Sequence, residues 1–271
     1  MKKFLLILIS FFTLYSCNDI SVEIEDETQK KTAKEIITSD FLFNSVFTIA
    51  IQTIHEIELK ENLKYGQLLL FCDTCAEVSY FLSKDSSYVE NITINYEKFS
   101  CSPFGQRKIG KIHIFLTGLI SEEGTTVRVD LQDFYFEHHK VEGTQSFVNT
   151  SFPGFSWCFE QIVEHGKISL PGGAYILYES QKEVNINFSS NAYVQTSKSC
   201  GFNSSGIKFN TETVTPLEKS FSCEFVQKGS IIIELADYSD MIVDYGDGTC
   251  DNLYNITSEF NEYQSIGCIL E

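Results

Sequence analysis

The acidic string from Asp244 to Asn252 is the first place in this chain where residue type and spacing could support chemistry. The carboxylates of Asp244, Asp247 and Asp251 are oxygen ligands of the kind that calcium takes. Their spacing, however, lacks the alternate ligand positions and the distant bidentate glutamate of an EF-hand loop. A turn or β-bulge explains the Asp-Gly pairs through positive φ and side-chain to backbone hydrogen bonds. We therefore predict a structural turn and keep these aspartates as a secondary calcium candidate.

Cysteines form the second reactive set, since the chain holds 9 of them. Cys75 and Cys101 enclose nearly the same interval as Cys223 and Cys250, and each interval reads as strand, polar turn and returning strand. Opposed residues of a hairpin bring their Cβ atoms within bridging distance. We therefore predict disulfides Cys75–Cys101 and Cys223–Cys250, in internally similar hairpins at 72–101 and 223–250. The other cysteines of the body have no assigned partner: Cys72, Cys158, Cys200 and Cys268.

Familiar catalytic patterns are missing from the sequence. The pair Cys72 and Cys75 opens a predicted strand without a second CxxC or a nearby histidine, which argues against redox and zinc chemistry. The neighbours His138 and His139 would point to opposite faces of a strand. No HExxH, GxSxG, P-loop or dinucleotide fingerprint occurs. We expect no enzyme activity and no cofactor. A hydrolase alternative would need carboxylates paired as in glycosidases, for which the candidates are Asp130, Asp133 and Glu137.

The N-terminus has the pattern of a lipoprotein signal peptide. Met1-Lys2-Lys3 precedes an apolar run that ends in Leu14-Tyr15-Ser16-Cys17. This run is too short to span a bilayer as a helix, so we interpret residues 1–16 as a signal peptide. Cys17 is then the lipidated residue, and its acyl chains attach the protein to the membrane. The expected location is the outer membrane, with the protein facing the periplasm or the cell surface.

Residues 17–38 are predicted to be a polar tether behind the lipidated cysteine, because they offer little to bury. The acidic stretch from Asn18 to Glu27 is similar to the surface-export signal of Bacteroidota lipoproteins. The whole chain carries a formal charge of -17, from 37 acidic and 20 basic residues. That balance excludes nucleic acid as a partner and argues against electrostatic binding to anionic lipid.

One amphipathic helix is predicted over 39–66. Its apolar residues recur with helical periodicity, and Ser39 or Asp40 could cap its start. We expect the apolar stripe to pack on a sheet, while Glu56, Glu58 and Glu61 occupy the exposed side. The stripe consists of Phe43, Val46, Phe47, Ala50, Ile51, Ile54 and Ile57.

Residues 67–271 are predicted to form an antiparallel β domain. Alternation is clear around Val127, Val129 and Leu131, as in a sheet with one solvated face. The fold class is therefore all-β, an antiparallel meander or sandwich-like body with one N-terminal helix. We favour one continuous sheet over two half-domains because no linker separates the halves. The predicted strands are 76–82, 91–96, 111–116, 125–136, 166–170, 174–179, 183–188, 230–235 and 241–245.

Several short strings follow one another along the chain in a recognisable order. Besides the lipobox, they are Ile94-Asn95-Tyr96 ahead of a cysteine, Gly110 to Ile114 with Thr117-Gly118, Val141 to Thr144, and Val243 to Asn252. Together these strings resemble uncharacterised Bacteroidota lipoproteins. The resemblance covers most of the chain after Cys17, but it implies no activity, ligand or catalytic residue. The chain departs from the family pattern in its last strand, because Leu253 to Thr257 alternates only in part.

The sequence favours a non-catalytic, lipid-anchored protein with a structural or protein-binding role and an unknown partner. The alternative is a surface module that binds a glycan or another small ligand, which would need exposed aromatic side chains. Trp157, the only tryptophan, is flanked by apolar residues and is expected in the core. The platform candidates are Tyr135, Tyr175, Tyr178 and Tyr193.

Overall fold

The computed structural model describes residues 18–61, 76–85, 87–96, 106–151, 156–187, 192–258 and 262–266. One long helix, α1, precedes 13 strands. The elements are α1 (Asn18–Lys60), β1 (Glu77–Leu82), β2 (Val89–Asn95), β3 (Lys108–Leu116), β4 (Thr126–Phe136), β5 (His139–Asn149), β6 (Ser156–Ser169), β7 (Tyr175–Asn187), β8 (Ala192–Phe202), β9 (Lys208–Ser220), β10 (Lys228–Leu235), β11 (Met241–Asp247), β12 (Leu253–Ser258) and β13 (Glu262–Ile266).

All strands belong to one antiparallel meander in which each strand pairs with its neighbours in sequence, from β1 to β13. This confirms the predicted all-β antiparallel body with a single N-terminal helix. The sheet is continuous, so the alternative of two sandwich-like halves is wrong.

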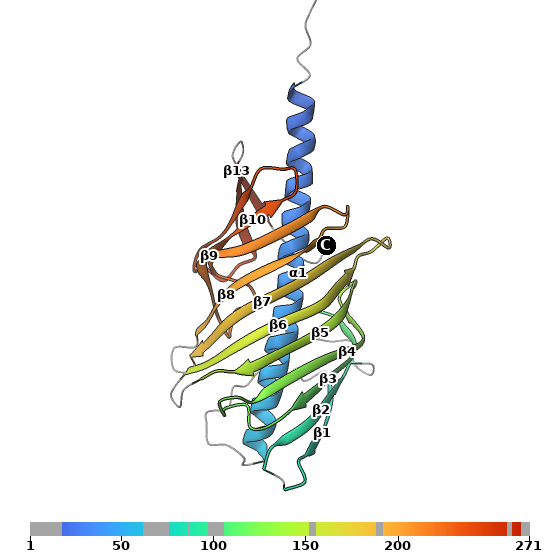
Figure 1. The fold of residues 1–271 in the computed structure, drawn as a ribbon, viewed down its shortest axis with the longest axis vertical. Coiled ribbons are helices and arrows are strands. Elements are labelled where there is room, and N and C mark those ends of the chain that lie inside the picture. Colours follow the sequence, from blue (N-terminus) through green and yellow to red (C-terminus); the bar gives the residue numbers. More distant parts are fainter. Residues whose placement is uncertain are drawn as a thin grey trace, which may run out of the picture.

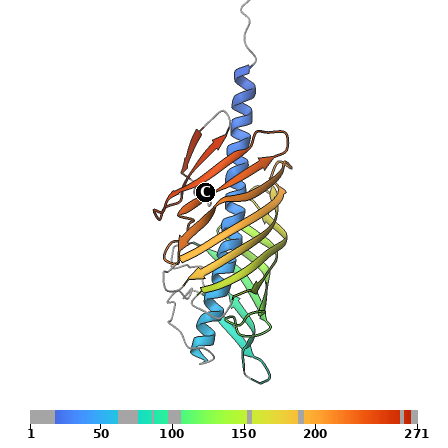
Figure 2. The ribbon, with the colours of Figure 1, turned by 60° about the vertical axis from the view of Figure 1, so that its left-hand side comes forward.

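The sheet curls around the helix along its length (Figures 1 and 2). α1 has 43 residues and is therefore about 64 Å long at 1.5 Å per residue. Successive strands of a sheet are about 4.8 Å apart, which makes this sheet roughly 58 Å wide. The two lengths are comparable, so the helix serves as a central spine for most of the sheet. β1 lies near its C-terminal end, and the last strands lie near its N-terminal half (Figure 1).

Strict alternation of side chains produces the inner, helix-facing surface. β7 alternates exposed and buried positions over almost its whole length. The inner aromatic residues meet the helix directly: the Phe47 ring lies 5.0 Å from the Phe147 ring and 5.9 Å from the Phe159 ring, centroid to centroid. Phe43 stacks on Tyr178 at 5.4 Å. The core is therefore the layer between helix and sheet.

The predicted tether at 17–38 is wrong from Asn18 onward, because α1 already begins there. Gln29, Thr32 and Glu35 are buried against the far end of the sheet. Glu35, for example, accepts hydrogen bonds from the backbone N–H and hydroxyl of Ser204. Sequence polarity suggested a solvated linker, but these polar groups are satisfied by loops distant in the chain.

The predicted helix at 39–66 starts too late and runs past the observed end at Lys60; residues 62–75 lie outside the described residues. Ser39 and Asp40 are internal to α1, so neither is its N-cap. The predicted apolar stripe is buried in full. Glu58, expected on the exposed side, is also buried and accepts a 2.8 Å hydrogen bond from the backbone N–H of Ile120.

By composition and length, α1 contains one segment, Glu27–Lys60, that could cross a membrane. Within the structure 67% of that apolar window is buried. Enclosure by the sheet therefore accounts for its hydrophobicity.

Several strands were not predicted or were predicted in fragments. The predicted strands at 174–179 and 183–188 form the single strand β7, and the predicted strand at 166–170 is only the end of β6. β5, β8, β9 and β13 have no predicted counterpart, whereas the doubtful region after Leu253 does form the regular strand β12.

Cys223 and Cys250 form the predicted disulfide, with a Cα–Cα distance of 5.7 Å. Cys158 and Cys200 are free thiols. The proposed partners Cys75 and Cys101 lie outside the described residues, as do Cys17, Cys72 and Cys268.

Candidate functional site

A buried charge pair joins the middle of the helix to the middle of the sheet. The Lys182 ammonium, from the inner face of β7, donates to Asp40 Oδ1 at 2.6 Å and to Asn44 Oδ1 at 2.8 Å. Tyr178 donates its hydroxyl to the same Asp40 oxygen at 2.8 Å, and Asn44 Nδ2 donates to Oδ2 at 2.7 Å. Both carboxylate oxygens are thus occupied. Burial, together with the Asp40 charge, raises the pKa of Tyr178 well above its usual value.

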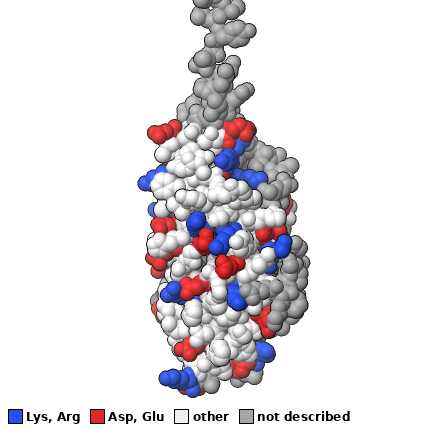
Figure 3. Space-filling view, turned by 90° about the vertical axis from the view of Figure 1, so that its right-hand side faces the viewer, with Lys and Arg blue, Asp and Glu red and all other residues white. Residues whose placement is uncertain are grey.

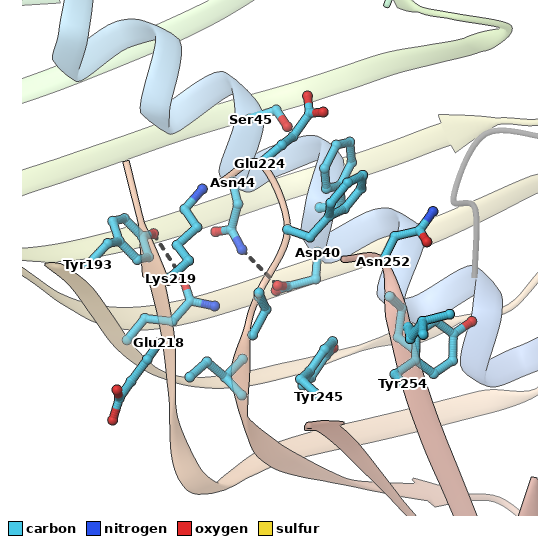
Figure 4. A pocket seen from close by; sticks show the side chains of 17 residues that line it. Asp40, Asn44, Ser45, Tyr193, Glu218, Lys219, Glu224, Tyr245, Asn252 and Tyr254 are labelled. Atoms are coloured by element: carbon cyan, nitrogen blue, oxygen red, sulfur yellow. Dashed lines mark hydrogen bonds between the residues drawn. The ribbon is translucent and has the colours of Figure 1, made fainter. Parts of the chain in front are cut away.

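A pocket opens beside this pair, between α1, β8, β9, β12 and the loop that joins β9 to β10 (Figure 4). The centre of a water molecule can occupy about 40 Å³ of it, and the whole hollow, including open solvent at its mouth, measures about 610 Å³. The pocket therefore has room for only a few water-sized groups. Most of the wall is apolar, formed by Ile37, Phe41, Leu217, Phe225, Val226 and Leu253.

Lys219 and Gln195 carry the free donors of the pocket. The Lys219 ammonium lies 5.0 Å from the centroid of the Tyr193 ring, and it forms no ion pair with any described residue. Burial lowers the pKa of Lys219 to about 8, although the charges of Glu224 and Asp40 oppose the shift. Gln195 is 1% exposed; its Oε1 accepts from the Tyr193 hydroxyl at 3.0 Å, while its Nε2 has no hydrogen-bond partner.

Glu224 closes one side of the pocket from the β9–β10 loop. Burial raises the pKa of its carboxyl, against a hydrogen bond from Gln106 and the charges of Lys108 and Lys219. The same loop carries Phe225, whose ring stacks at 5.9 Å on Phe41 of the helix. The loop therefore covers the helix where strands of the sheet do not.

The calcium candidates Asp244, Asp247 and Asp251 do lie near one another, along a surface hollow between β11 and β12. Each carboxylate caps its own turn: Asp244 accepts from the backbone N–H of Gly246, Asp247 from Thr249 and Asp251 from Leu253. Across the described residues, no group of His, Cys, Asp or Glu has the arrangement of a metal site. The turn interpretation therefore accounts for these aspartates.

The aromatic platform is largely wrong as predicted. Tyr178 and Tyr193 are buried, as is Trp157, which was expected in the core. Tyr135 and Tyr175 are exposed on the outer face and occupy one row of the sheet, through Lys140 and Ser169 of the intervening strands. Three strand spacings put them roughly 14 Å apart, too far to hold one sugar ring between them.

The structure does not gather the hydrolase candidates into a pocket. Asp130 pairs with Arg128 at 3.0 Å, Asp133 with Lys140 at 3.5 Å, and Glu137 accepts from the backbone N–H of Arg107. The histidines are also dispersed. His139 is buried, and its pKa is lowered by burial and by the charge of His138; His55 packs edge-on against Trp157 at 5.2 Å.

Sequence reasoning missed Lys182, Lys219 and Gln195. A signal for Lys182 was present, because it continues the inward row of β7 through Ile176, Tyr178, Ser180, Val184 and Ile186. A lysine in an inward row needs a buried carboxylate partner. Lys219 and Gln195 lie on strands that the sequence did not reveal, so their inward position had no comparable signal.

No family model matches this chain, and neither a curated protein nor a solved structure with significant similarity to it was found.

Proposed function

We propose that the chain is a lipid-anchored, non-catalytic protein of the outer membrane, facing the periplasm or the cell surface, with a structural or protein-binding role. The observation that carries this proposal is the position of α1, which begins at Asn18, directly after the lipobox cysteine. An anchor at Cys17 is then joined to the β body by a continuous helix.

The N-terminal turns of α1 project beyond the sheet before the helix becomes buried at Gln29 (Figures 1 and 2). At 1.5 Å per residue this projecting part is roughly 16 Å long. It would keep the sheet at a fixed distance from the lipid, which suits a protein that presents a surface to a partner.

The outer surface supports a binding role better than a catalytic one. Leu177 and Phe202 are directly paired across β7 and β8, and Tyr175 follows on the same outward row. Tyr175 is 50% and Phe202 45% exposed. Elsewhere acidic and basic side chains are interspersed with wide uncharged areas (Figure 3).

Metabolic labelling with an alkyne fatty acid tests the anchor. The native chain should take up the label and enter the detergent phase, whereas Cys17→Ala should do neither and Cys158→Ser should behave as the native chain. Equal labelling of Cys17→Ala would refute the anchor. Protease treatment of intact cells then distinguishes the surface from the periplasm, and proximity labelling that depends on Cys17 identifies neighbouring proteins.

A second candidate function, binding of a small ligand, is favoured by the pocket beside Asp40. Its buried Gln195 Nε2 and its Lys219 ammonium have no hydrogen-bond or ion-pair partner among the described residues, and a bound molecule could satisfy both.

A further inference from the structure

We propose that the pocket between α1, β8, β9 and β12 binds a monocarboxylate with an apolar tail, whose carboxylate accepts from Lys219 Nζ and Gln195 Nε2. The inference rests on the second candidate function and is independent of the lipid anchor.

Two polar groups of this pocket have no hydrogen-bond or ion-pair partner among the described residues, Gln195 Nε2 and the Lys219 ammonium, and both are donors. Asp40 already accepts from Lys182, Tyr178 and Asn44, and the Asn44 side chain both donates to Asp40 and accepts from Lys182. The Tyr193 hydroxyl fixes Gln195 through its Oε1, which leaves Nε2 as the free group. A ligand that completes this set must therefore bring acceptors.

The charge balance favours an anion of low charge. Asp40 is compensated by Lys182 at 2.6 Å, whereas Lys219 forms no ion pair with a described residue. Glu218 is exposed at the rim and points away from the helix (Figure 4), whereas Glu224 lines the pocket from the β9–β10 loop. A single carboxylate can be neutralised by Lys219, but a multiply charged phosphate would meet Glu224 without a second free cation among the lining residues.

Size and wall chemistry define the rest of the ligand. The 40 Å³ that is open to water centres suits a carboxylate head better than a sugar ring. Phe225, Val226 and Leu253 also line the pocket and offer apolar contact to a tail. Each buried CH₂ group of that tail should strengthen binding about fourfold.

Titration calorimetry tests the carboxylate site. The chain from Asn18 to its C-terminus is titrated with acetate, butanoate, hexanoate and inorganic phosphate. We expect affinity to rise along the carboxylate series, and methyl hexanoate and phosphate to bind more weakly than hexanoate. Hexanoate affinity should also fall above pH 8, because burial lowers the pKa of Lys219 to about 8 and the neutral amine no longer attracts a carboxylate. Absence of binding by every carboxylate, affinity that is independent of chain length, or tighter binding of phosphate would each overturn the proposal.

Two variants locate the site. Lys219→Met removes a charged donor and should weaken hexanoate binding roughly 10- to 150-fold. Gln195→Glu preserves the shape and can keep the Tyr193 hydrogen bond, but it directs a carboxylate at the ligand and should also weaken binding. Lys208→Met is the matched control, because Lys208 is an exposed lysine on the same strand, β9. Circular dichroism confirms folding, and unchanged affinity in folded Lys219→Met and Gln195→Glu would overturn the site. Loss of lipid labelling in Cys17→Ala would leave this result unaffected.

Discussion

Removal of Lys182 alone should destabilise the fold strongly, and removal of Asp40 as well should add less than the loss of Asp40 on its own. Lys182→Met keeps the length of the buried side chain but leaves Asp40 without its cation and Asn44 Oδ1 without its donor. Breaking a buried pair on one side typically costs about 3–5 kcal/mol, since one charge stays buried and uncompensated.

The structure favours the lower end of that range. The Asp40 side chain is 16% exposed and keeps its hydrogen bonds from Tyr178 and Asn44, so about 3 kcal/mol is expected. For a chain of this size that corresponds to a fall of roughly 6–12 °C in Tm. The double variant Asp40→Leu with Lys182→Met leaves no buried charge without a counter-charge, although Asn44 then lacks both of its partners, so its loss should be smaller than the sum of the two single losses.

Urea unfolding of the four chains in this cycle gives the coupling energy between the two residues. We expect about 2 kcal/mol or more, with m values unchanged. The reasoning is refuted if Lys182→Met is as stable as the native chain, or if the double variant loses the sum of the two single losses.

Three further predictions concern the core, the disulfide and pH. Phe47→Ala should lower the free energy of unfolding in urea by about 3–5 kcal/mol, because Phe47 is 1% exposed and packed among aromatic rings. Phe115→Ala, at a 43% exposed position, should lower it by less than about 1 kcal/mol. Equal losses would contradict a core between helix and sheet. Cys223→Ser with Cys250→Ser opens a loop with a sequence separation of 27 and should cost about 3–4 kcal/mol, while Cys158→Ser, which removes a free thiol, should unfold like the native chain. Burial lowers the pKa of Lys219 in the folded chain to about 8 from 10.5, so the unfolded chain binds more protons between those pH values. The free energy of unfolding should therefore rise from pH 8 towards pH 10, and Lys219→Met should abolish that rise. An identical pH profile for the native chain and Lys219→Met would exclude Lys219 as its source.

The fold class could be predicted because it follows from the local spacing of apolar residues, which alternate in strands and recur every three to four residues in the helix. The stripe from Phe43 to Ile57 has helical spacing, and the hairpin that carries Cys223 and Cys250 has strand spacing around a polar turn. Both signals depend on residues close together in the sequence.

The enclosure of the helix could not be predicted in the same way. Gln29 donates to Ser239, and Asn203 donates to Thr32, each across most of the chain. In the sequence, polar residues with such distant partners resemble a solvated linker, so their composition predicts a tether where α1 begins. The pocket was missed for a related reason, because β8 and β9 are rich in Ser, Thr and Lys and show too little apolar alternation to be recognised as strands.

The position of the spine at the start of the chain also has a consequence for the order of folding. Each strand pairs with its sequence neighbour, so the hairpins involve short chain closures and can form as the chain emerges. The helix, by contrast, is made first, and its contacts extend from Tyr80 beside Lys60 to Ser239 beside Gln29. The apolar surface of α1 therefore stays partly uncovered until the last third of the chain has been made. During that interval the exposed apolar surface makes the nascent protein prone to aggregation. Under the proposed export of the chain, this interval falls in the compartment where the protein folds, and α1 is the segment that a holding chaperone there would protect.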